Sequence, residues 1–299
     1  MAGSGQWHEP VLVAEVVRFL APAPAALIVD ATVGTGGHAE ALLARGARVI
    51  GIDQDPAALD RARERLRPYT DRVQLLPGNF RDLPALVPPV PRVDGVLFDL
   101  GASSLQFDSP ERGFSFLAAG PLDMRMDPTA PVTAADLVNR LPEAELARIL
   151  WEYGEERYAR RIARAIVQQR PLRTTTELAR LVACLYPPGR HRIHPATRTF
   201  QALRIAVNDE LGALEAGLAG AVRLLAPGGV LCVISFHSLE DRIVKHFLRR
   251  EALTGRLEVL TKKPLRPEED EVSRNPRARS AKLRAARVRE VGPGLVSCP

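Results

Sequence analysis

The chain of 299 residues lacks several features that mark particular classes of protein. No apolar run approaches the roughly 18–20 residues of a membrane-spanning helix, and the N-terminus lacks the basic start and apolar core of a signal peptide. Its three cysteines, Cys184, Cys232 and Cys298, lie far apart, which argues against a disulfide framework or a zinc site. We therefore expect a cytoplasmic protein with reduced thiols, no bound metal and no membrane contact.

Excess positive charge is confined to one part of the sequence. The net charge is +6, and residues 241–290 hold 15 Lys and Arg against 8 Asp and Glu, whereas the rest of the chain holds 26 against 27. Between Arg274 and Arg289, seven basic residues occur with no acidic residue among them. Such a segment suits a polyanion, most simply nucleic acid, although a solvated or flexible tail would have the same composition.

The first hundred residues alternate between short apolar runs and amphipathic segments. Runs rich in Val, Ile and Leu predict parallel strands buried on both faces, and the segments between them predict helices. The architecture is then an α/β fold with a doubly wound sheet, which binds ligands at the carboxyl ends of its strands. The expected strands are Ala26–Asp30, Ala47–Asp53, Val73–Pro77 and Val93–Asp99, and the expected helices are Val11–Leu20, Gly37–Arg45 and Pro56–Leu66.

The middle of the chain shows only helical periodicity. In residues 155–169, apolar side chains recur on one face and four arginines on another. We therefore expect a discontinuous α/β domain (1–107 and 195–299) that contains an all-helical insertion (108–194). After the insertion we expect a long helix Ala196–Leu225, a turn at Pro227-Gly228-Gly229, a strand Val230–Ser235, a helix Leu239–Arg250, and an antiparallel pair formed by Leu257–Lys263 and Ala281–Val288.

A glycine loop joins the first expected strand to the helix after it. The strand ends at Asp30, the loop reads Gly34-Thr35-Gly36-Gly37-His38, and the next strand ends at Asp53. Glycines at a helix start bring the backbone close to a ligand, and an acidic residue after the second strand can bind ribose hydroxyls. The pattern predicts a nucleoside-bearing cofactor. Because the spacing satisfies the dinucleotide pattern G-x-G-x-x-G/A, a nicotinamide-dependent dehydrogenase is one candidate.

Three further features favour S-adenosylmethionine as the cofactor. Asp30 precedes the loop, where a carboxylate would oppose a pyrophosphate but can orient an ammonium group. Asp99 ends the fourth strand, and Pro227-Gly228-Gly229 precedes a late apolar strand, both of which are typical of class I methyltransferases. Each feature also has a structural explanation, since glycines make turns and Asp30 could cap a helix. Together the three features favour the methyl donor.

Longer blocks of the sequence are distinctive. The blocks are His8-Glu9-Pro10-Val11-Leu12, Glu111-Arg112-Gly113-Phe114-Ser115-Phe116, Gly120-Pro121-Leu122-Asp123-Met124-Arg125-Met126-Asp127, Tyr153-Gly154-Glu155-Glu156-Arg157, His194-Pro195-Ala196-Thr197-Arg198-Thr199-Phe200-Gln201, Ile234-Ser235-Phe236-His237-Ser238-Leu239-Glu240-Asp241-Arg242 and Asn275-Pro276-Arg277-Ala278-Arg279-Ser280. They resemble one enzyme family, the bacterial 16S rRNA (cytosine-N4)-methyltransferases called RsmH or MraW. The similarity runs in order from His8 to about Arg289.

The resemblance implies a class I S-adenosylmethionine-dependent methyltransferase, with a Rossmann-like sheet and an inserted helical domain. It also implies methylation of the N4 amine of a cytidine in the decoding region of 16S rRNA, in the small ribosomal subunit. From the residues alone, Phe80 would pass for a core aromatic and Gln106 for a surface loop residue. Carried over by position, Gly36, Gly37 and His38 would hold the amino-acid end of the cofactor, Asp53 the ribose and Phe80 the adenine, with Asp99 and Gln106 completing the cofactor site.

The group that activates the cytosine amine is less clear from the sequence. Many amino-methyltransferases carry an Asp/Asn-Pro-Pro-aromatic motif after the fourth strand, but here that position reads Asp99-Leu100-Gly101-Ala102. Asp99 is one catalytic candidate, and the loop after strand 230–235 offers His237 or Ser235 as another. A purely structural role for His237 at the start of a helix that Ser238 caps is equally open.

Candidate RNA contacts are more numerous for phosphates than for bases. Phosphate contacts are expected from the arginines of residues 274–289 and 157–164 and from Arg190, Arg192 and Arg198. Aromatic residues make up only 5% of the chain, and Phe114, Phe116 and Phe236 are the candidates for stacking on a flipped-out base. The insertion could grip RNA or form a homodimer surface. A non-catalytic ribosome-assembly factor is a third candidate function.

Overall fold

The computed structural model describes residues 10–187, 189, 191 and 193–290, and the chain divides into two compact units. Unit 1 comprises Met1–Gly101 and Gly212–Pro299, and unit 2 comprises Ala102–Leu211. The α/β unit is therefore discontinuous, and the inserted segment is longer at both ends than residues 108–194. Among the described residues, every helix is too short or too polar to cross a membrane.

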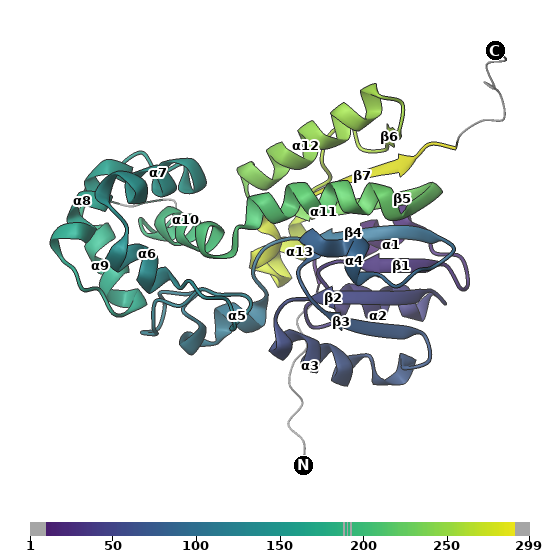
Figure 1. Ribbon diagram of the computed structural model, residues 1–299, viewed down its shortest axis with the longest axis horizontal. Coiled ribbons are helices and arrows are strands. Elements are labelled where there is room, and N and C mark those ends of the chain that lie inside the picture. Colours follow the sequence, from purple (N-terminus) through teal and green to yellow (C-terminus); the bar gives the residue numbers. More distant parts are fainter. Residues whose placement is uncertain (1–9, 188, 190, 192, 291–299) are drawn as a thin grey trace. The chain divides into compact units, whose positions relative to one another are not determined.

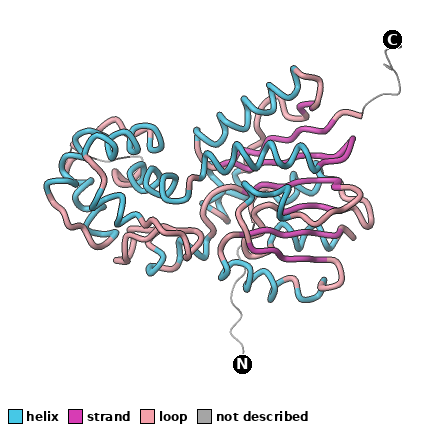
Figure 2. The backbone as a smooth tube through the Cα atoms, in the orientation of Figure 1, coloured by secondary structure: helices cyan, strands magenta, loops and turns pink. Residues whose placement is uncertain are grey.

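Unit 1 is built on a seven-stranded sheet in the order β3-β2-β1-β4-β5-β7-β6 (Figures 1 and 2). The five strands from β3 to β5 pair in parallel, whereas β7 pairs antiparallel with both β5 and β6. The expected antiparallel closing pair is thus confirmed. The strands are β1 (Leu27–Asp30), β2 (Arg48–Asp53), β3 (Val73–Pro77), β4 (Val93–Asp99), β5 (Leu225–Ser235), β6 (Leu257–Val259) and β7 (Lys282–Val288).

Helices cover both faces of this sheet, so the unit has three layers. Leu20, Leu42 and Leu59, from the first three helices, belong to one apolar core cluster. Leu83, Leu218 and Phe247, from later helices, belong to a second core cluster. Burial on both faces explains why the strands are continuous apolar runs. The helices are α1 (Val13–Leu20), α2 (Gly37–Ala44), α3 (Pro56–Arg65), α4 (Leu83–Leu86), α12 (Ser238–Leu253) and α13 (Glu269–Arg274).

The long helix expected over 196–225 is broken into two helices, α10 (Thr197–Asn208) and α11 (Glu210–Leu224). Asp209 caps α10 in the left-handed conformation, with φ of 46°, and its N–H donates to the carbonyl of Ile205. Short acidic side chains tolerate this conformation better than most residues. Arg204 then donates two hydrogen bonds of 2.8 Å each to the carboxylate of Glu210. The break therefore lies at a capped junction, which periodicity alone does not reveal.

Unit 2 is helical, as expected, with its own apolar core. Around α8, the buried residues are Ala159, Ile162, Ala163 and Ile166, the face that the sequence predicted. Apart from one isolated bridge, between Pro121 and Thr174, its described residues form no strand. Besides α10, the helices are α5 (Ser104–Asp108), α6 (Ala134–Arg140), α7 (Glu143–Gly154), α8 (Ala159–Gln168) and α9 (Thr175–Cys184).

Two glycines fix a loop at the start of unit 2. A Cβ atom at Gly113 would lie 2.2 Å from the carbonyl oxygen of Pro121, and one at Gly120 would lie 1.8 Å from that of Pro110. Both contacts are with backbone, which cannot move aside as a side chain can. The backbone segments of this loop therefore pack against each other more closely than any residue with a side chain allows.

Candidate cofactor and active site

Three acidic residues end neighbouring strands at one edge of the sheet of unit 1. Asp30 is the last residue of β1, Asp53 of β2 and Asp99 of β4. β1 pairs in parallel with both β2 and β4, so the three carboxyl ends lie at the same edge. This edge is where doubly wound sheets bind ligands. The sequence predicted all three positions.

The glycine loop is tied to the end of β2. The N–H of Gly34 donates to Asp53 Oδ2 at 2.9 Å, and Asp53 Oδ1 accepts the N–H of Asp55 at the same distance. Burial raises the pKa of Asp53 to about 6, although hydrogen bonds from backbone amides oppose the rise. Gly36 caps α2 with φ of 86°, a conformation that favours glycine. Asp53 therefore shapes the loop, and each of its oxygens can accept a further hydrogen bond.

The Gly37 position has no room for a side chain. A Cβ atom there would lie 2.9 Å from Pro10 Cγ and 3.2 Å from a guanidinium nitrogen of Arg65. Gly37 is the first residue of α2, where backbone N–H groups have no partner within the helix. Such a helix start suits a negatively charged group such as a carboxylate. This geometry agrees with the role that the sequence predicted for the loop.

Asp30 is fully buried and only partly satisfied. Its Oδ1 accepts the N–H of Thr32 at 3.2 Å, whereas Oδ2 has no hydrogen-bond partner among the described residues. Burial raises the pKa of Asp30 to about 7, because water no longer stabilises the charged form; the nearby His38 works against this rise. An unpaired carboxylate in such a place favours a cationic ligand group.

His38 and Asp99 face each other beside Asp30. His38 Nε2 lies 3.3 Å from Asp99 Oδ2, and His38 is 5% exposed. Neither ring nitrogen of His38 has a hydrogen-bond partner among the described residues, nor does Asp99 Oδ1. Burial by itself lowers the pKa of His38, but the carboxylates of Asp99 and Asp30 outweigh it, so the pKa lies above its usual value of 6.5. Unpaired polar atoms of three residues thus occur together in one buried group.

These residues fit the methionine end of S-adenosylmethionine. That end carries one ammonium and one carboxylate group. The carboxylates of Asp30 and Asp99 can accept hydrogen bonds from the ammonium, and the backbone amides at Gly36 and Gly37 can donate to the carboxylate. A dinucleotide would instead place a pyrophosphate at this loop, beside the buried Asp30. The donor and acceptor set is therefore the one that the methyl donor requires.

Phe80 and Gln106 are placed differently from the other predicted cofactor residues. Phe80 is half-buried and packs edge-on against Phe98, with ring centroids 5.5 Å apart. Gln106 belongs to unit 2, where it is 4% exposed and forms a capping box with Ser103 at the start of α5. Of the seven predicted cofactor residues, all but Gln106 thus belong to unit 1, and the cofactor roles of all seven remain predictions.

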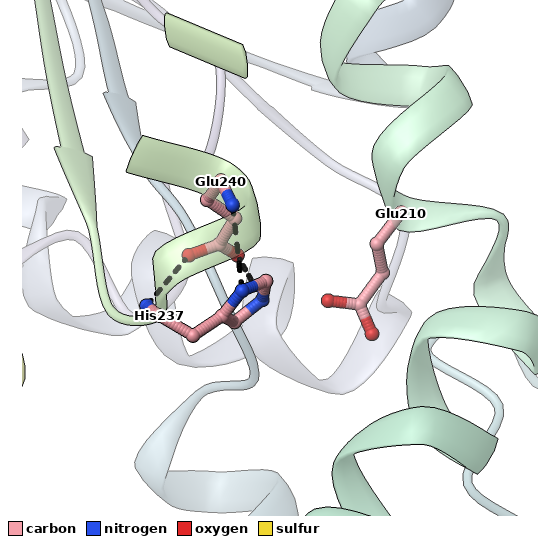
Figure 3. A group of neighbouring side chains, drawn as sticks. All are labelled: Glu210, His237 and Glu240. Carbon is pink, nitrogen blue, oxygen red and sulfur yellow. Dashed lines mark hydrogen bonds and ion pairs between the residues drawn. The ribbon is translucent and has the colours of Figure 1, made fainter. Parts of the chain in front are cut away.

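The second catalytic candidate, His237, is the N-cap of α12. Its Nδ1 accepts the N–H of Glu240 at 3.4 Å, and Glu240 Oε2 accepts the N–H groups of Phe236 and His237. His237 Nε2 lies 3.1 Å from Glu240 Oε1 without hydrogen-bond geometry. Figure 3 shows the two side chains facing each other; Glu210, also drawn, belongs to unit 2. The capping residue is therefore His237, whereas the sequence analysis considered Ser238. The three-residue spacing from His237 to Glu240 is that of a capping box and could have indicated this cap.

Ser235, Phe236 and His237 follow β5, the neighbour of β4 in the sheet. Asp99 pairs with Ile234, and the N–H of Leu100 donates to the carbonyl of Ile234 at 3.0 Å. The loop that carries His237 therefore leaves the sheet beside Asp99. Ser235 is 2% exposed and its Oγ contacts the carbonyl of Lys282 at 3.4 Å. Ser235 is consequently the weaker of the two candidates in this loop.

Two predicted RNA contacts are wrong. Arg284 is 7% exposed in β7, where its Nε donates to Asp241 Oδ1 at 2.7 Å, and Lys282 binds the other oxygen of Asp241. These charges hold the strand to α12, and the segment is not a free tail. Phe114 is 5% exposed and therefore cannot stack on a base. Arg277, Arg279 and Arg198 are exposed, whereas Arg190 and Arg192 lie outside the described residues.

The comparison with known families decides between the candidate functions. A profile described as the MraW methylase family matches residues 5–289. The chain belongs to the MraW methylase family. It is therefore a methyltransferase with the class I fold, and its methyl donor is S-adenosylmethionine. A nicotinamide-dependent dehydrogenase is not favoured.

Individual relatives are similar over almost the whole chain. The "Ribosomal RNA small subunit methyltransferase H" of Deinococcus radiodurans is 56% identical over 282 residues, covering 93% of this chain and 88% of its own. The protein of the same name from Thermomicrobium roseum is 54% identical over 303 residues, covering 93% of each chain. An rRNA methylase structure from Streptococcus thermophilus shares 12% identity, covers 95% of this chain and 100% of its own, and has a TM-score of 0.45.

Proposed function

We propose that this protein methylates the N4 amine of a cytidine in 16S rRNA of the small ribosomal subunit, in the cytoplasm, with S-adenosylmethionine as donor. The observation that carries the proposal is the buried group of Asp30, His38 and Asp99, whose unpaired atoms suit the methionine end of the donor. The names of the two relatives support small-subunit rRNA as the substrate. All the catalytic residues below belong to unit 1, so the mechanism does not require a second copy of the chain.

The chemistry is transfer of a methyl group from the sulfonium of the donor to the amine nitrogen, which must lie in line with the bond that breaks. Gly36, Gly37 and His38 would hold the amino-acid end, Asp53 the ribose and Phe80 the adenine. The N–H of Gly34 donates to Asp53, so the amino-acid end bound at the loop and the ribose bound at Asp53 would each influence the position of the other. The first contribution of the protein is thus to align the methyl donor with the amine nitrogen.

Asp99 is the proposed acceptor for the amine. The lone pair of the cytosine N4 is delocalised into the ring, so an acceptor that binds an N–H of the amine helps to expose it. Asp99 Oδ1 has no hydrogen-bond partner among the described residues, and the side chain is 25% exposed. His38 lies at the other oxygen. Asp99 would thus face both the ammonium of the donor and the amine of the substrate.

His237 is the proposed base that removes the proton. In the structure Nδ1 accepts the N–H of Glu240, so the proton of the neutral ring lies on Nε2, and His237 takes up a proton at Nδ1 when this N-cap hydrogen bond opens. A proton leaves the amine as the methyl group arrives, and a positioned imidazole can take it up.

Two substitutions of His237 separate catalysis from helix capping. Asn is a good N-cap residue, whereas Ala is not. We expect His237→Asn to keep the thermal stability of the wild type and His237→Ala to lower it. Both variants should lower the single-turnover methylation rate by roughly 100-fold with little change in donor affinity. A single-turnover rate for His237→Asn equal to that of the wild type would remove His237 from the mechanism.

The proposed reaction is tested by methyl labelling of unmodified small ribosomal subunits, followed by nucleoside analysis. The expected product is labelled N4-methylcytidine. Label in another nucleoside would contradict the proposed acceptor, and binding to subunits without any label would favour a non-catalytic assembly factor. Asp99→Asn should lose most of the transfer and, because Asp99 also faces the ammonium of the donor, should weaken donor binding as well.

A further inference from the structure

The exposed side of α8 in unit 2 is uniformly basic. Arg157, which precedes the helix, and Arg160, Arg161 and Arg164 within it are all exposed, and we call them the arginine face. α8 itself contains no acidic residue. Arg164 has an exposed partner, Glu143, at 3.5 Å between nitrogen and oxygen, whereas Arg160 and Arg161 have no ion-pair partner among the described residues. The charge of this face is thus largely uncompensated.

The arrangement of these charges does not help the helix. Arg160 and Arg161 lie in the first turn of α8, where the positive end of the helix dipole disfavours cations. The four arginines are also spaced three and four residues apart, so like charges lie next to one another on the helix surface. The buried side of α8, by contrast, consists only of apolar residues that pack in the core of unit 2. Because the charges destabilise the element that carries them, an anionic partner is the simplest explanation for them.

The arginine face continues onto the start of α10. Arg198 is exposed, and its Nη1 donates to the carbonyl of Glu155 at 2.8 Å, two residues before Arg157. The backbones also meet there, since a Cβ atom at Gly154 would lie 2.6 Å from the carbonyl oxygen of Arg198. The turn between α7 and α8 is therefore fixed against the first turn of α10. Arg198 extends the basic surface in this direction.

An aromatic pair includes a residue that comes shortly before Arg198 in the sequence. His194, four residues before Arg198, is exposed, and its ring lies 4.6 Å from the ring of Phe116 at an angle of 32°. Phe116 also packs edge-on against Phe200, with ring centroids 4.8 Å apart. Leu117 beside it is 92% exposed. A tilted ring pair with one exposed ring and an exposed apolar neighbour is a surface on which a planar group can stack.

We propose that the arginine face, Arg198 and the aromatic pair form one binding surface for single-stranded RNA. The arginines would contact successive phosphates, and the aromatic pair would stack on an unpaired base. The proposal deepens the proposed function and rests on it, because it assigns binding of the RNA substrate to unit 2. A double helix would not suit the platform, since its bases are stacked on each other.

The first test neutralises two arginines that the fold does not use. The variant is Arg160→Gln with Arg161→Gln, and the matched control is Arg61→Gln with Arg63→Gln, which removes the same charge from the exposed side of α3. The readout is the salt dependence of binding to a short unstructured oligouridylate by fluorescence anisotropy. Two lost phosphate contacts lower the slope of log K against log salt by about 1.4. When the salt concentration falls from 1 M to 0.1 M, the affinity of the wild type should therefore rise roughly 25-fold more than the affinity of the variant.

The second test removes the exposed half of the aromatic pair. His194 Nδ1 accepts the N–H of Ala196 at 3.2 Å, a contact that the side chain of Asn can replace, so His194→Asn removes the ring and retains the turn. We expect binding of the oligouridylate to weaken at least roughly fivefold, as is typical of a lost stacking contact. With an abasic oligomer of the same length, the variant and the wild type should bind equally.

Several outcomes would overturn the proposal. An unchanged salt slope for the α8 variant, or an equal change in the α3 control, would show that the arginine face is not a phosphate-binding surface. Weaker binding of small subunits with unchanged binding of the oligomer would assign the surface to a protein partner. Donor affinity, measured by calorimetry, should be unchanged in every variant. Failure of the proposed function itself is distinguishable, because it would appear as missing cytidine methylation by the wild type.

Discussion

Replacing Asp30 by Asn should stabilise the protein in the absence of its methyl donor. The carboxyl group of Asp30 is 0% exposed, and one oxygen has no hydrogen-bond partner among the described residues. The amide side chain of Asn would keep the acceptor for the N–H of Thr32 and would carry no charge at any pH. The substitution therefore removes the cost of ionising a buried group while leaving the turn after β1 in place.

The size of the effect follows from the pKa of Asp30. The pKa is raised from 3.8 to about 7 by burial, and each pKa unit corresponds to about 1.4 kcal/mol. The folded protein thus holds this proton more tightly than the unfolded chain does, so the free energy of unfolding falls as the pH rises from about 4 to about 7. Above pH 7 the full cost applies, on the order of 4 kcal/mol. Below pH 4 Asp30 is protonated in both the folded and the unfolded state, so the wild type and Asp30→Asn should have similar free energies of unfolding.

Denaturant unfolding between pH 5 and pH 8 tests this reasoning. The free energy of unfolding of the wild type should fall over that range more steeply than that of Asp30→Asn. Asp71→Asn is the matched control, because the Asp71 side chain is 77% exposed and its removal should leave the pH dependence unchanged. Parallel curves for the wild type and Asp30→Asn would refute the argument. In calorimetry, the stabilised variant should bind S-adenosylmethionine more weakly, since the ammonium loses its partner.

Two further substitutions test the packing of each unit. Gly120→Ala should destabilise unit 2 by at least about 2 kcal/mol, because its Cβ would lie 1.8 Å from the carbonyl oxygen of Pro110; a melting temperature equal to that of the wild type would contradict the tight loop. Asp241→Ala should destabilise unit 1 by about 3 kcal/mol, because Arg284 and Lys282 lose their partner in a largely buried site. Arg284→Gln, by contrast, should leave the salt slope of RNA binding unchanged, and a lower slope would restore Arg284 to the RNA contacts.

Patterns that depend on neighbouring residues were predicted well from the sequence. The bounds of β3 and β4 match the expected strands, because buried parallel strands are continuous apolar runs. The apolar face of α8 also matches, because helical periodicity sets which side chains meet the core. The acidic residues at the strand ends followed from the same alternation, since the carboxyl ends of parallel strands share one edge.

Features that depend on contacts between distant residues were not predictable in this way. The ion pair of Arg284 with Asp241 joins residues 43 positions apart, so the burial of this arginine side chain within the predicted strand could not be foreseen. The burial of Phe114 depends on the folding of the loop around it. The break at Asp209 depends on one residue in the left-handed conformation. His237 was a candidate catalyst by its place after β5, but its capping role required the geometry of Glu240.

The discontinuous α/β unit has a consequence for synthesis on the ribosome. β4 ends at Asp99, and its neighbour β5 begins only at Leu225, so 125 residues must be made before the sheet can extend. At about 5–20 residues per second, the edge of β4 stays without its partner for roughly 6–25 seconds. During that time the inserted segment is complete and contiguous, and it can bury its own core first. The nascent enzyme is therefore most vulnerable to aggregation through the open edge of β4, and chaperone binding to the emerging chain should peak in this interval.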